Sequence, residues 1–184
     1  VKHENGSYFY DIEDLDHNGN VDLSDGGDRY IAGQATPKVI LGSNISFRYK
    51  NYYISIQMNG AFGHKIFNGT GLAYTSMACF PDYNVFKDAP KKNIVDQRVS
   101  DYWLEKGDYL NFEHLTIGYN VPLRSKLIRS LRVSCNISNI GTITGYKGLT
   151  PMINSYVVNS TMGIDDKRNY PLYRTYSLGL SVQF

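Results

Sequence analysis

The sequence predicts an all-β fold: a segment of an antiparallel transmembrane β-barrel with about five long strands and long extracellular loops. First, apolar and polar residues alternate with the two-residue period of a strand in several stretches. Second, each stretch has about 10 to 12 residues, near the ~9–11 that cross a bilayer at a tilt and above the ~5–6 usual in globular sheets. Third, the links alternate between short and long, as the turns and loops of outer-membrane barrels do.

The first two predicted strands form a hairpin. In residues 39–49 the odd positions are largely apolar, and after the polar link 50–51 the pattern restarts and continues over residues 52–62. Residues 64–107 follow. They are rich in Gly, Asn, Asp, Pro and charged side chains, and this composition predicts a loop.

The third predicted strand covers about residues 108–121 and changes phase within its length. Leu110 and Phe112 share one phase, whereas Leu115 and the apolar residues after it take the other. One extra residue in a strand moves all later side chains to the opposite face. The slip at Glu113-His114 therefore predicts a β-bulge.

The last two predicted strands are separated by a long link. Residues 122–130 form a turn, residues 131–138 a strand, and residues 141–172 a second loop. The final strand, from residue 176 to residue 184, has the most regular alternation in the chain.

The order of the links predicts the topology. The two long loops lie outside the cell, and the two short turns face the periplasm. Residues 1–37 are predicted as an extracellular loop, and residues 38–184 as the C-terminal barrel strands and loops. Five strands do not close a barrel, because the smallest single-chain barrels have about eight strands and hydrocarbon does not tolerate open sheet edges. The sequence therefore predicts a part of a larger barrel, or an assembly of several copies.

Residues 14–25 follow the spacing of a calcium-binding loop. Oxygen-bearing side chains occupy the ligand positions, Gly19 takes the turn position and Val21 the apolar position. The last ligand is an aspartate instead of the usual bidentate glutamate, which predicts weaker binding or a structural Ca²⁺. The alternative is a turn rich in Asp, Asn and Gly without an ion. The predicted ligands are Asp14, Asp16, Asn18, Asn20 (through its backbone carbonyl), Asp22 and Asp25.

The sequence contains no pattern typical of an enzyme. The four histidines are not paired with acids or cysteines in the manner of a zinc site, and no nucleophile elbow, P-loop or dinucleotide fingerprint occurs. The net charge of +2 is too small to indicate nucleic-acid binding. Cys79 and Cys135 are predicted to be unpaired thiols.

Three aromatic residues near the start of the third strand have two interpretations. Tyr102, Trp103 and Tyr109 form either a platform for sugar rings or part of an aromatic girdle at the membrane interface, which we favour.

Five motifs follow one another along the chain: the acidic run 14–25, SDYWLEKGDYL at 100–110, LTIGYNVP at 115–122, NIGTITGYKG at 139–148 and the ending 170–184. Together they resemble SusC/RagA-type TonB-linked outer-membrane transporters, in the C-terminal part of their β-barrel. The resemblance covers nearly the whole chain in the order of the family. The chain departs from the family at Thr150 and Met152, where the family usually has acidic residues around a proline, and this affects an outer loop only.

The resemblance implies a function in nutrient import. It implies a barrel of about 22 strands with a plugged lumen, in the outer membrane of a Gram-negative bacterium and in contact with its lipid. It also implies a plug and a TonB-interacting segment N-terminal to these residues, a SusD-like surface lipoprotein as partner, and an oligosaccharide or peptide as cargo. It further implies a C-terminal signal for barrel assembly, which comprises Tyr176, Leu178, Leu180, Val182 and Phe184.

A second hypothesis remains open at this point. A secreted, calcium-stabilised β-sandwich that binds glycan would show the same alternation, with Leu178 and Leu180 buried in a soluble core.

Overall fold

The computed structural model describes residues 2–4, 7–22, 24, 27–95, 97–124, 127–153 and 162–184. The chain divides into two compact units. The loop unit consists of Val1–Thr36, Lys65–Glu105 and Met152–Asn169. The sheet unit consists of Pro37–His64, Lys106–Pro151 and Tyr170–Phe184.

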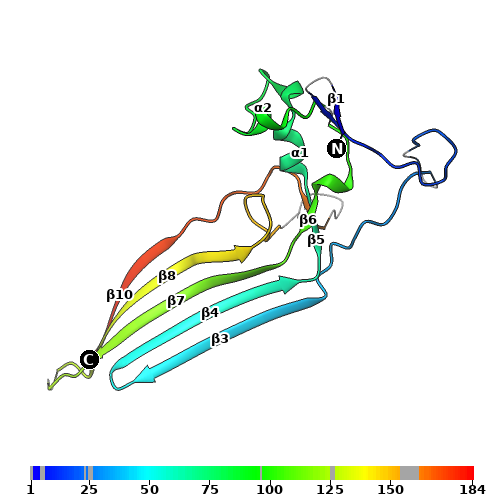
Figure 1. Cartoon of the computed structure of the whole chain (residues 1–184). Coiled ribbons are helices and arrows are strands. Elements are labelled where there is room, and N and C mark those ends of the chain that lie inside the picture. The colour runs from blue at the N-terminus through cyan, green and yellow to red at the C-terminus, as the bar shows by residue number, and fades with distance from the viewer. Residues whose placement is uncertain are drawn as a thin grey trace. The chain divides into compact units, whose positions relative to one another are not determined.

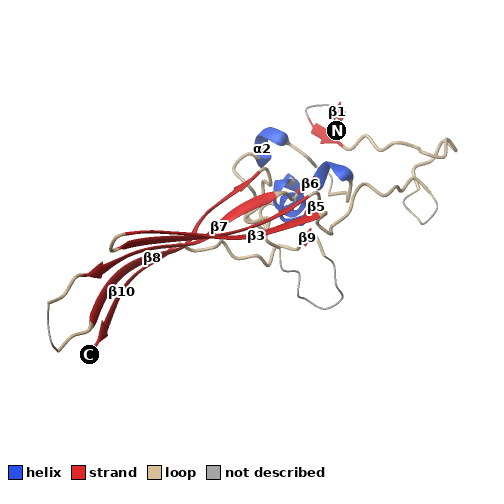
Figure 2. Ribbon diagram, turned by 90° about the horizontal axis from the view of Figure 1, so that it is seen from below, coloured by secondary structure: helices blue, strands red, loops and turns tan. Residues whose placement is uncertain are grey.

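The sheet unit is built on one five-stranded antiparallel sheet with the strand order β10-β8-β7-β4-β3 (Figure 1). The predicted strands are confirmed, and the chain is mainly β-structure. Figure 2 shows the five strands as a single curved layer. The strands are β3 (Val39–Tyr49), β4 (Tyr52–Phe62), β7 (Tyr109–Val121), β8 (Ser130–Thr144) and β10 (Thr175–Gln183).

Strand β8 is longer than the sequence indicates. Gly141 was predicted to begin a loop, but it lies opposite Phe112, and Ile143 lies opposite Leu110. The pairing with β7 therefore decides where β8 ends, and it ends at Thr144.

The register gives the sheet one apolar and one polar face. Phe47 lies opposite Ile54, which lies opposite Ile117 on the next strand. Ile117 in turn lies opposite Cys135, and Cys135 opposite Leu178. One position further along, the corresponding row is polar throughout: Ser46, Ser55, Thr116, Asn136 and Ser177.

The predicted β-bulge in β7 is confirmed. The register shifts between Phe112 and His114, so that Glu113 is the extra residue relative to β4. The side-chain amides of Gln57 and Asn59 both donate to Glu113 Oε2 at 3.1 Å. The bulge keeps the apolar residues on both sides of it on the same face.

The loop unit contains several short elements around a small core. The core side chains include Ile66, Ile94 and Trp103, and a three-stranded sheet has the order β6-β5-β9. The elements are β1 (Lys2–Glu4), β2 (Ser7–Phe9), β5 (Lys65–Asn68), α1 (Gly69–Thr75), η1 (Met77–Cys79), α2 (Ala89–Lys92), η2 (Asp101–Trp103), β6 (Leu104–Lys106) and β9 (Ile164–Asp165).

These elements correct the prediction of a plain loop over residues 64–107. They are too short to show a hydrophobic period, and local caps stabilise them. Asn68 accepts a hydrogen bond from the amide of Gly71 at the start of α1, and Ser76 accepts one from the amide of Ala78 at the start of η1.

Two further findings concern single features. Cys79 and Cys135 are both free thiols, as the sequence indicates. Within the described residues, no helix has the length and apolar character needed to span a membrane.

Candidate functional site

The apolar face of the sheet is widely exposed. Leu178 on β10 is 85% exposed, and Phe47 on β3 and Ile143 on β8 are 63% and 65% exposed. Within the described residues of the sheet unit, no helix or second sheet covers either face. Exposed apolar surface of this extent marks a site of contact with membrane or protein.

The opposite face is a network of polar side chains that bridge neighbouring strands. Ser46 Oγ donates to Ser55 Oγ at 3.1 Å, and Thr116 Oγ1 donates to Asn136 Oδ1 at 2.9 Å. Arg132 Nε donates to Asn120 Oδ1 at 2.9 Å near the far end of the same face. These side chains bind each other across the strands, so this face of the sheet is polar while the opposite face is apolar.

This amphipathic sheet argues against the β-sandwich hypothesis. A sandwich buries the apolar face of one sheet against a second sheet about 10 Å away. Tyr176, Leu178 and Leu180 instead stand on an uncovered face. A lipid-facing surface fits this arrangement.

Both edges of the sheet are open within the described structure. β3 pairs only with β4, and β10 pairs only with β8. Each edge strand therefore presents unpaired backbone groups on its outer side, which favours pairing with further strands.

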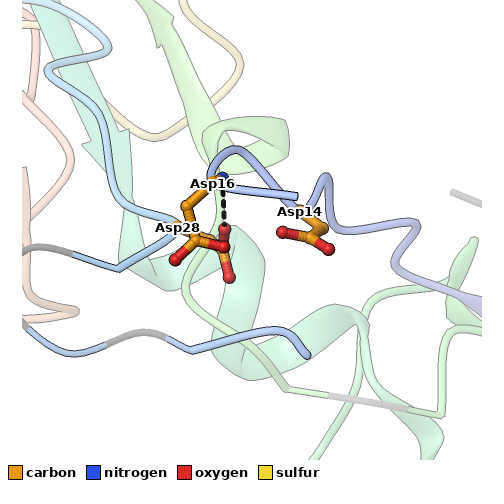
Figure 3. A group of neighbouring side chains, drawn as sticks. All are labelled: Asp14, Asp16 and Asp28. Carbon is orange, nitrogen blue, oxygen red and sulfur yellow. Dashed lines mark hydrogen bonds between the residues drawn. The ribbon is translucent and has the colours of Figure 1, made fainter. Parts of the chain in front are cut away.

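The acidic loop, which begins with the run 14–25 and continues to Asp28, brings three carboxylates of the loop unit together. Oxygen atoms of Asp14, Asp16 and Asp28 all lie within 4.8 Å of one another. Figure 3 shows the three side chains, with the hydrogen bond from the Asp16 amide to Asp28 dashed. Carboxylate oxygens at such separations are suitable ligands for Ca²⁺.

Asp28 organises this loop from a buried position. It is 6% exposed, its Oδ1 accepts from the amide of Leu15 at 2.6 Å, and its Oδ2 accepts from the amide of Asp22 at 2.7 Å. The hydrogen bond from the Asp22 amide has the largest effect and, with that from the Leu15 amide, holds the pKa of the Asp28 carboxyl below its ordinary value. The carboxylate is therefore charged throughout the neutral pH range.

The first turn of the loop is shaped by Asp14 and Asp16. Asp14 Oδ2 accepts from the amide of Gly19 at 2.7 Å, and Asp16 Oδ1 accepts from the amide of Asn18 at 3.0 Å. Gly19 has a φ of +84°, a conformation that glycine adopts without steric cost. This geometry gives Gly19 the turn position that the sequence assigned to it.

The remaining predicted ligands are less convergent. Asn18 Oδ1 accepts from the amide of Asn20 at 2.8 Å, whereas both oxygens of Asp22 bind Ser24, one through its amide and one through its hydroxyl. The hydroxyl of Ser24 is the main cause that lowers the pKa of Asp22. Asp25 lies outside the described residues.

Sequence reasoning missed Asp28 because it lies beyond the twelve-residue spacing on which the calcium pattern rests. The signal that was present is one more aspartate shortly after the pattern ends. Only the fold of the chain shows that this aspartate returns to the start of the loop.

The three predicted aromatic residues differ in their surroundings. Trp103 is 5% exposed and its Nε1 donates to the hydroxyl of Tyr10 at 2.6 Å. Tyr102 packs edge-on against Trp103 and is exposed, and Tyr109 begins β7 and is half-buried. Of the three, Tyr102 offers the most accessible ring, and the girdle and sugar-platform roles stay predictions.

The predicted assembly signal occupies an edge of the sheet. Tyr176, Leu178, Leu180 and Val182 are exposed on the apolar face of β10, and Phe184 follows that strand directly and is exposed as well. Their role in assembly stays a prediction.

Comparison with known proteins identifies relatives over almost the whole chain. The chain is 28% identical over 188 residues to the TonB-dependent receptor P3 of Formosa agariphila, and the match covers 93% of this chain. It is 26% identical over 182 residues to the TonB-dependent receptor SusC of Bacteroides thetaiotaomicron, with 92% of this chain covered. The chain resembles SusC/RagA-type TonB-dependent receptors. The resemblance inferred from the sequence is thereby confirmed.

Solved structures support the same fold. The RagAB peptide importer in its closed-closed state matches 91% of this chain with a TM-score of 0.67 at 18% identity. The RagAB peptide transporter matches 78% of it with a TM-score of 0.63. No family model matches the chain. These relatives are receptors and importers, not enzymes.

The chain corresponds to a minor part of each relative. It spans 18% of the P3 receptor, 17% of SusC and 20% of the RagAB chain.

Proposed function

We propose that this chain is the C-terminal barrel section of a TonB-dependent outer-membrane transporter that imports peptides or oligosaccharides. In this proposal the apolar face of the sheet contacts lipid in the outer membrane of a Gram-negative bacterium, and the polar face lines the lumen. A SusD-like lipoprotein covers the extracellular side, and TonB acts on a plug elsewhere in the same protein. The exposed residues of β10 and Phe184 serve as the assembly signal.

The observation that carries the proposal is the two-faced sheet. Its apolar rows continue across all five strands without interruption by a charge, while the opposite face is hydrogen-bonded and polar. Transmembrane barrels need this combination because lipid lies on one side of the sheet and water on the other. The likeness to RagAB supports a peptide cargo, and the likeness to SusC supports the transporter class.

Lipid contact is tested by fluorescence quenching at adjacent positions of β10. Single cysteines replace Leu178 or Ser177 in a full-length transporter whose Cys79 and Cys135 are changed to alanine, and each carries an environment-sensitive fluorophore in vesicles with brominated lipid. We expect strong quenching at position 178 and weak quenching at position 177, because neighbouring strand residues face opposite sides.

Equal quenching at the two positions contradicts the lipid-facing orientation. A protein that stays monomeric in buffer without detergent, with both fluorophores shielded from lipid, supports the β-sandwich instead.

We also propose a structural Ca²⁺ at the acidic loop, with Asp14, Asp16 and Asp28 as side-chain ligands. The convergence of three carboxylates supports this proposal, and the ion would neutralise their mutual repulsion. Calorimetric titration with Ca²⁺ should give binding heat for the wild type and much less for Asp16→Ala. Absence of heat from the wild type removes the metal site.

A further inference from the structure

The sheet unit contains a cavity of about 340 Å³ where β7 begins and β8 ends. This volume lies in the ~300–1,000 Å³ range of sites that bind small molecules. Leucine and proline side chains form part of its wall, from Leu149, Pro151, Pro171 and Leu172. Among the described residues that line the cavity, none carries a carboxylate or an aromatic ring, and Arg174 supplies the only formal charge. The cavity is therefore partly apolar and positively charged.

The guanidinium of Arg174 is held in place by backbone carbonyls. Its Nε donates to the carbonyl oxygen of Asn139 at 3.4 Å, and its Nη2 donates to that of Ile140. The side-chain amide of Asn139 in turn donates to the carbonyl oxygen of Tyr173 at 3.0 Å. Arg174 forms no ion pair with a carboxylate in the described part of the chain. Because a guanidinium carries five N–H donors, its charge and its remaining donors are available to a ligand.

Asn111 supplies an independent sign of a missing partner. It is 3% exposed and lies on β7 opposite Thr142 of β8. Its Oδ1 accepts from Thr142 Oγ1 at 2.9 Å, whereas its Nδ2 donates no hydrogen bond within the described structure. The unpartnered side-chain atoms without accessible surface belong to Asn59, His64 and Ser100, and Asn111 Nδ2 is not one of them. Since Asn111 lines the cavity, the free amide of a nearly buried side chain is open to a ligand there.

The two groups have the same chemical preference. The guanidinium of Arg174 and the Nδ2 of Asn111 donate hydrogen bonds and accept none. A carboxylate accepts through two oxygens, forms the stronger charge-assisted bonds and neutralises the guanidinium, whereas a cation would be repelled. A sugar ring would find no aromatic face among the described lining residues on which to stack. The lining therefore favours the carboxylate of a peptide.

We propose that this cavity binds a carboxylate group of a peptide cargo, with the Arg174 guanidinium and the Asn111 amide as its hydrogen-bond donors. This inference rests on the proposed transport function and names its cargo as a peptide with an accessible carboxylate. Both an acidic side chain and the C-terminus of a peptide offer this group. In the proposed orientation, this end of the sheet is extracellular, where cargo arrives.

Three peptides that differ in one group test the proposal. Acetyl-Ala-Ala-Glu-Ala-Ala-amide has its only carboxylate on a side chain, its glutamine counterpart has none, and the glutamine peptide with a free C-terminus has one at its end. Their affinities for a full-length transporter that contains this chain are measured in detergent by calorimetry. We expect at least one carboxylate peptide to bind about tenfold more tightly than the neutral peptide, as one charge-assisted contact allows. The tighter of the two identifies the source of the carboxylate.

Three variants locate this preference. In Asn111→Asp the side chain still accepts from Thr142, but a negative charge replaces the free donor, so the preference for a carboxylate should be lost. Asn136→Asp is the matched control, because Asn136 Oδ1 also accepts from a threonine, Thr116, at 2.9 Å and lies outside the cavity. This control should keep the preference. Arg174→Gln removes the cation, retains an amide that donates to a backbone carbonyl, and should abolish the preference.

The outcomes distinguish this inference from the proposed function. Thermal unfolding verifies that each variant is folded, and Arg174→Gln decides the matter where Asn111→Asp is not. Equal affinities of the three peptides, or a preference that survives either substitution in the cavity, overturn the carboxylate site and leave peptide transport standing. A preference that is lost in Asn136→Asp as well overturns the assignment to the cavity. Binding of none of the peptides overturns the peptide cargo and this inference together, and a galacturonate trisaccharide that binds instead identifies an acidic oligosaccharide as cargo.

Discussion

Asp28 is the residue on which the acidic loop depends most. It is buried and accepts hydrogen bonds from the amides of Leu15, Asp16 and Asp22. In Asp28→Asn, an amide NH₂ replaces one accepting oxygen and faces a backbone donor. We expect faster hydrogen exchange at the Leu15 and Asp22 amides in this variant. Asp88→Asn, outside the loop, should leave exchange at both amides unchanged, and unchanged protection in Asp28→Asn would contradict the assigned role.

The same residue predicts a pH dependence with a definite sign. The folded-state pKa of Asp28 lies below its ordinary value of 3.8, because backbone amides stabilise the charged form. Its contribution to stability is therefore complete above that ordinary value and is lost as the pH falls through the lower folded-state pKa. An acid titration of loop structure by NMR should show a smaller acid-induced loss for Asp28→Asn than for the wild type. Asp22 has a shift of the same sign, so some loss should remain.

At the scale of single residues, the acidic loop could be predicted from the sequence only in part. The pattern from Asp14 to Gly19 was sufficient to locate the loop, because its turn chemistry is local in sequence. Asp28 is brought to its place by tertiary folding, because it lies beyond the spacing of the calcium pattern and binds the amides of Leu15 and Asp22.

Strand β10 gives the most direct prediction at the scale of elements. Leu178 lies mid-strand on the apolar face, whereas its neighbour Ser177 lies opposite Asn136 on the polar face. Leu178→Arg should lower the free energy of unfolding in lipid vesicles by about 2–4 kcal/mol, the cost of a charge facing the middle of the bilayer. Ser177→Arg should cost about 0.5 kcal/mol or less. Urea unfolding of both variants in vesicles gives the comparison, and equal costs would contradict the assignment of faces.

The long strands were predictable because their alternation is strong and continues over many residues. Even the bulge at Glu113 left a trace, since the apolar phase changes there. The C-terminal half of β8 left none, because Gly141 has weak strand propensity and depends on its pairing with β7. The short elements of residues 64–107 depend on caps and on a shared core, which a local pattern does not reveal.

At the scale of the whole molecule, the open edges are the feature that requires explanation. Among the residues that the structure describes, β7 has neighbours on both sides, but β3 and β10 each have one. In an antiparallel strand, every second amide points away from a given neighbour, so half of the amides of each edge strand lack a strand partner. Hydrocarbon makes such unpaired groups costly, and a closed barrel removes them.

This leads to a prediction about barrel closure. In the 184-residue chain alone in detergent micelles, the outward amides of β3 and β10 should exchange rapidly while those of β7 are protected. In a full-length transporter that contains this chain, the same outward amides should become as protected as those of β7, because further strands pair with both edges. Hydrogen-exchange mass spectrometry on the two samples measures this difference. Protection that appears at only one edge indicates a sheet that stays open, and rapid exchange at both edges in the full-length protein excludes a closed barrel.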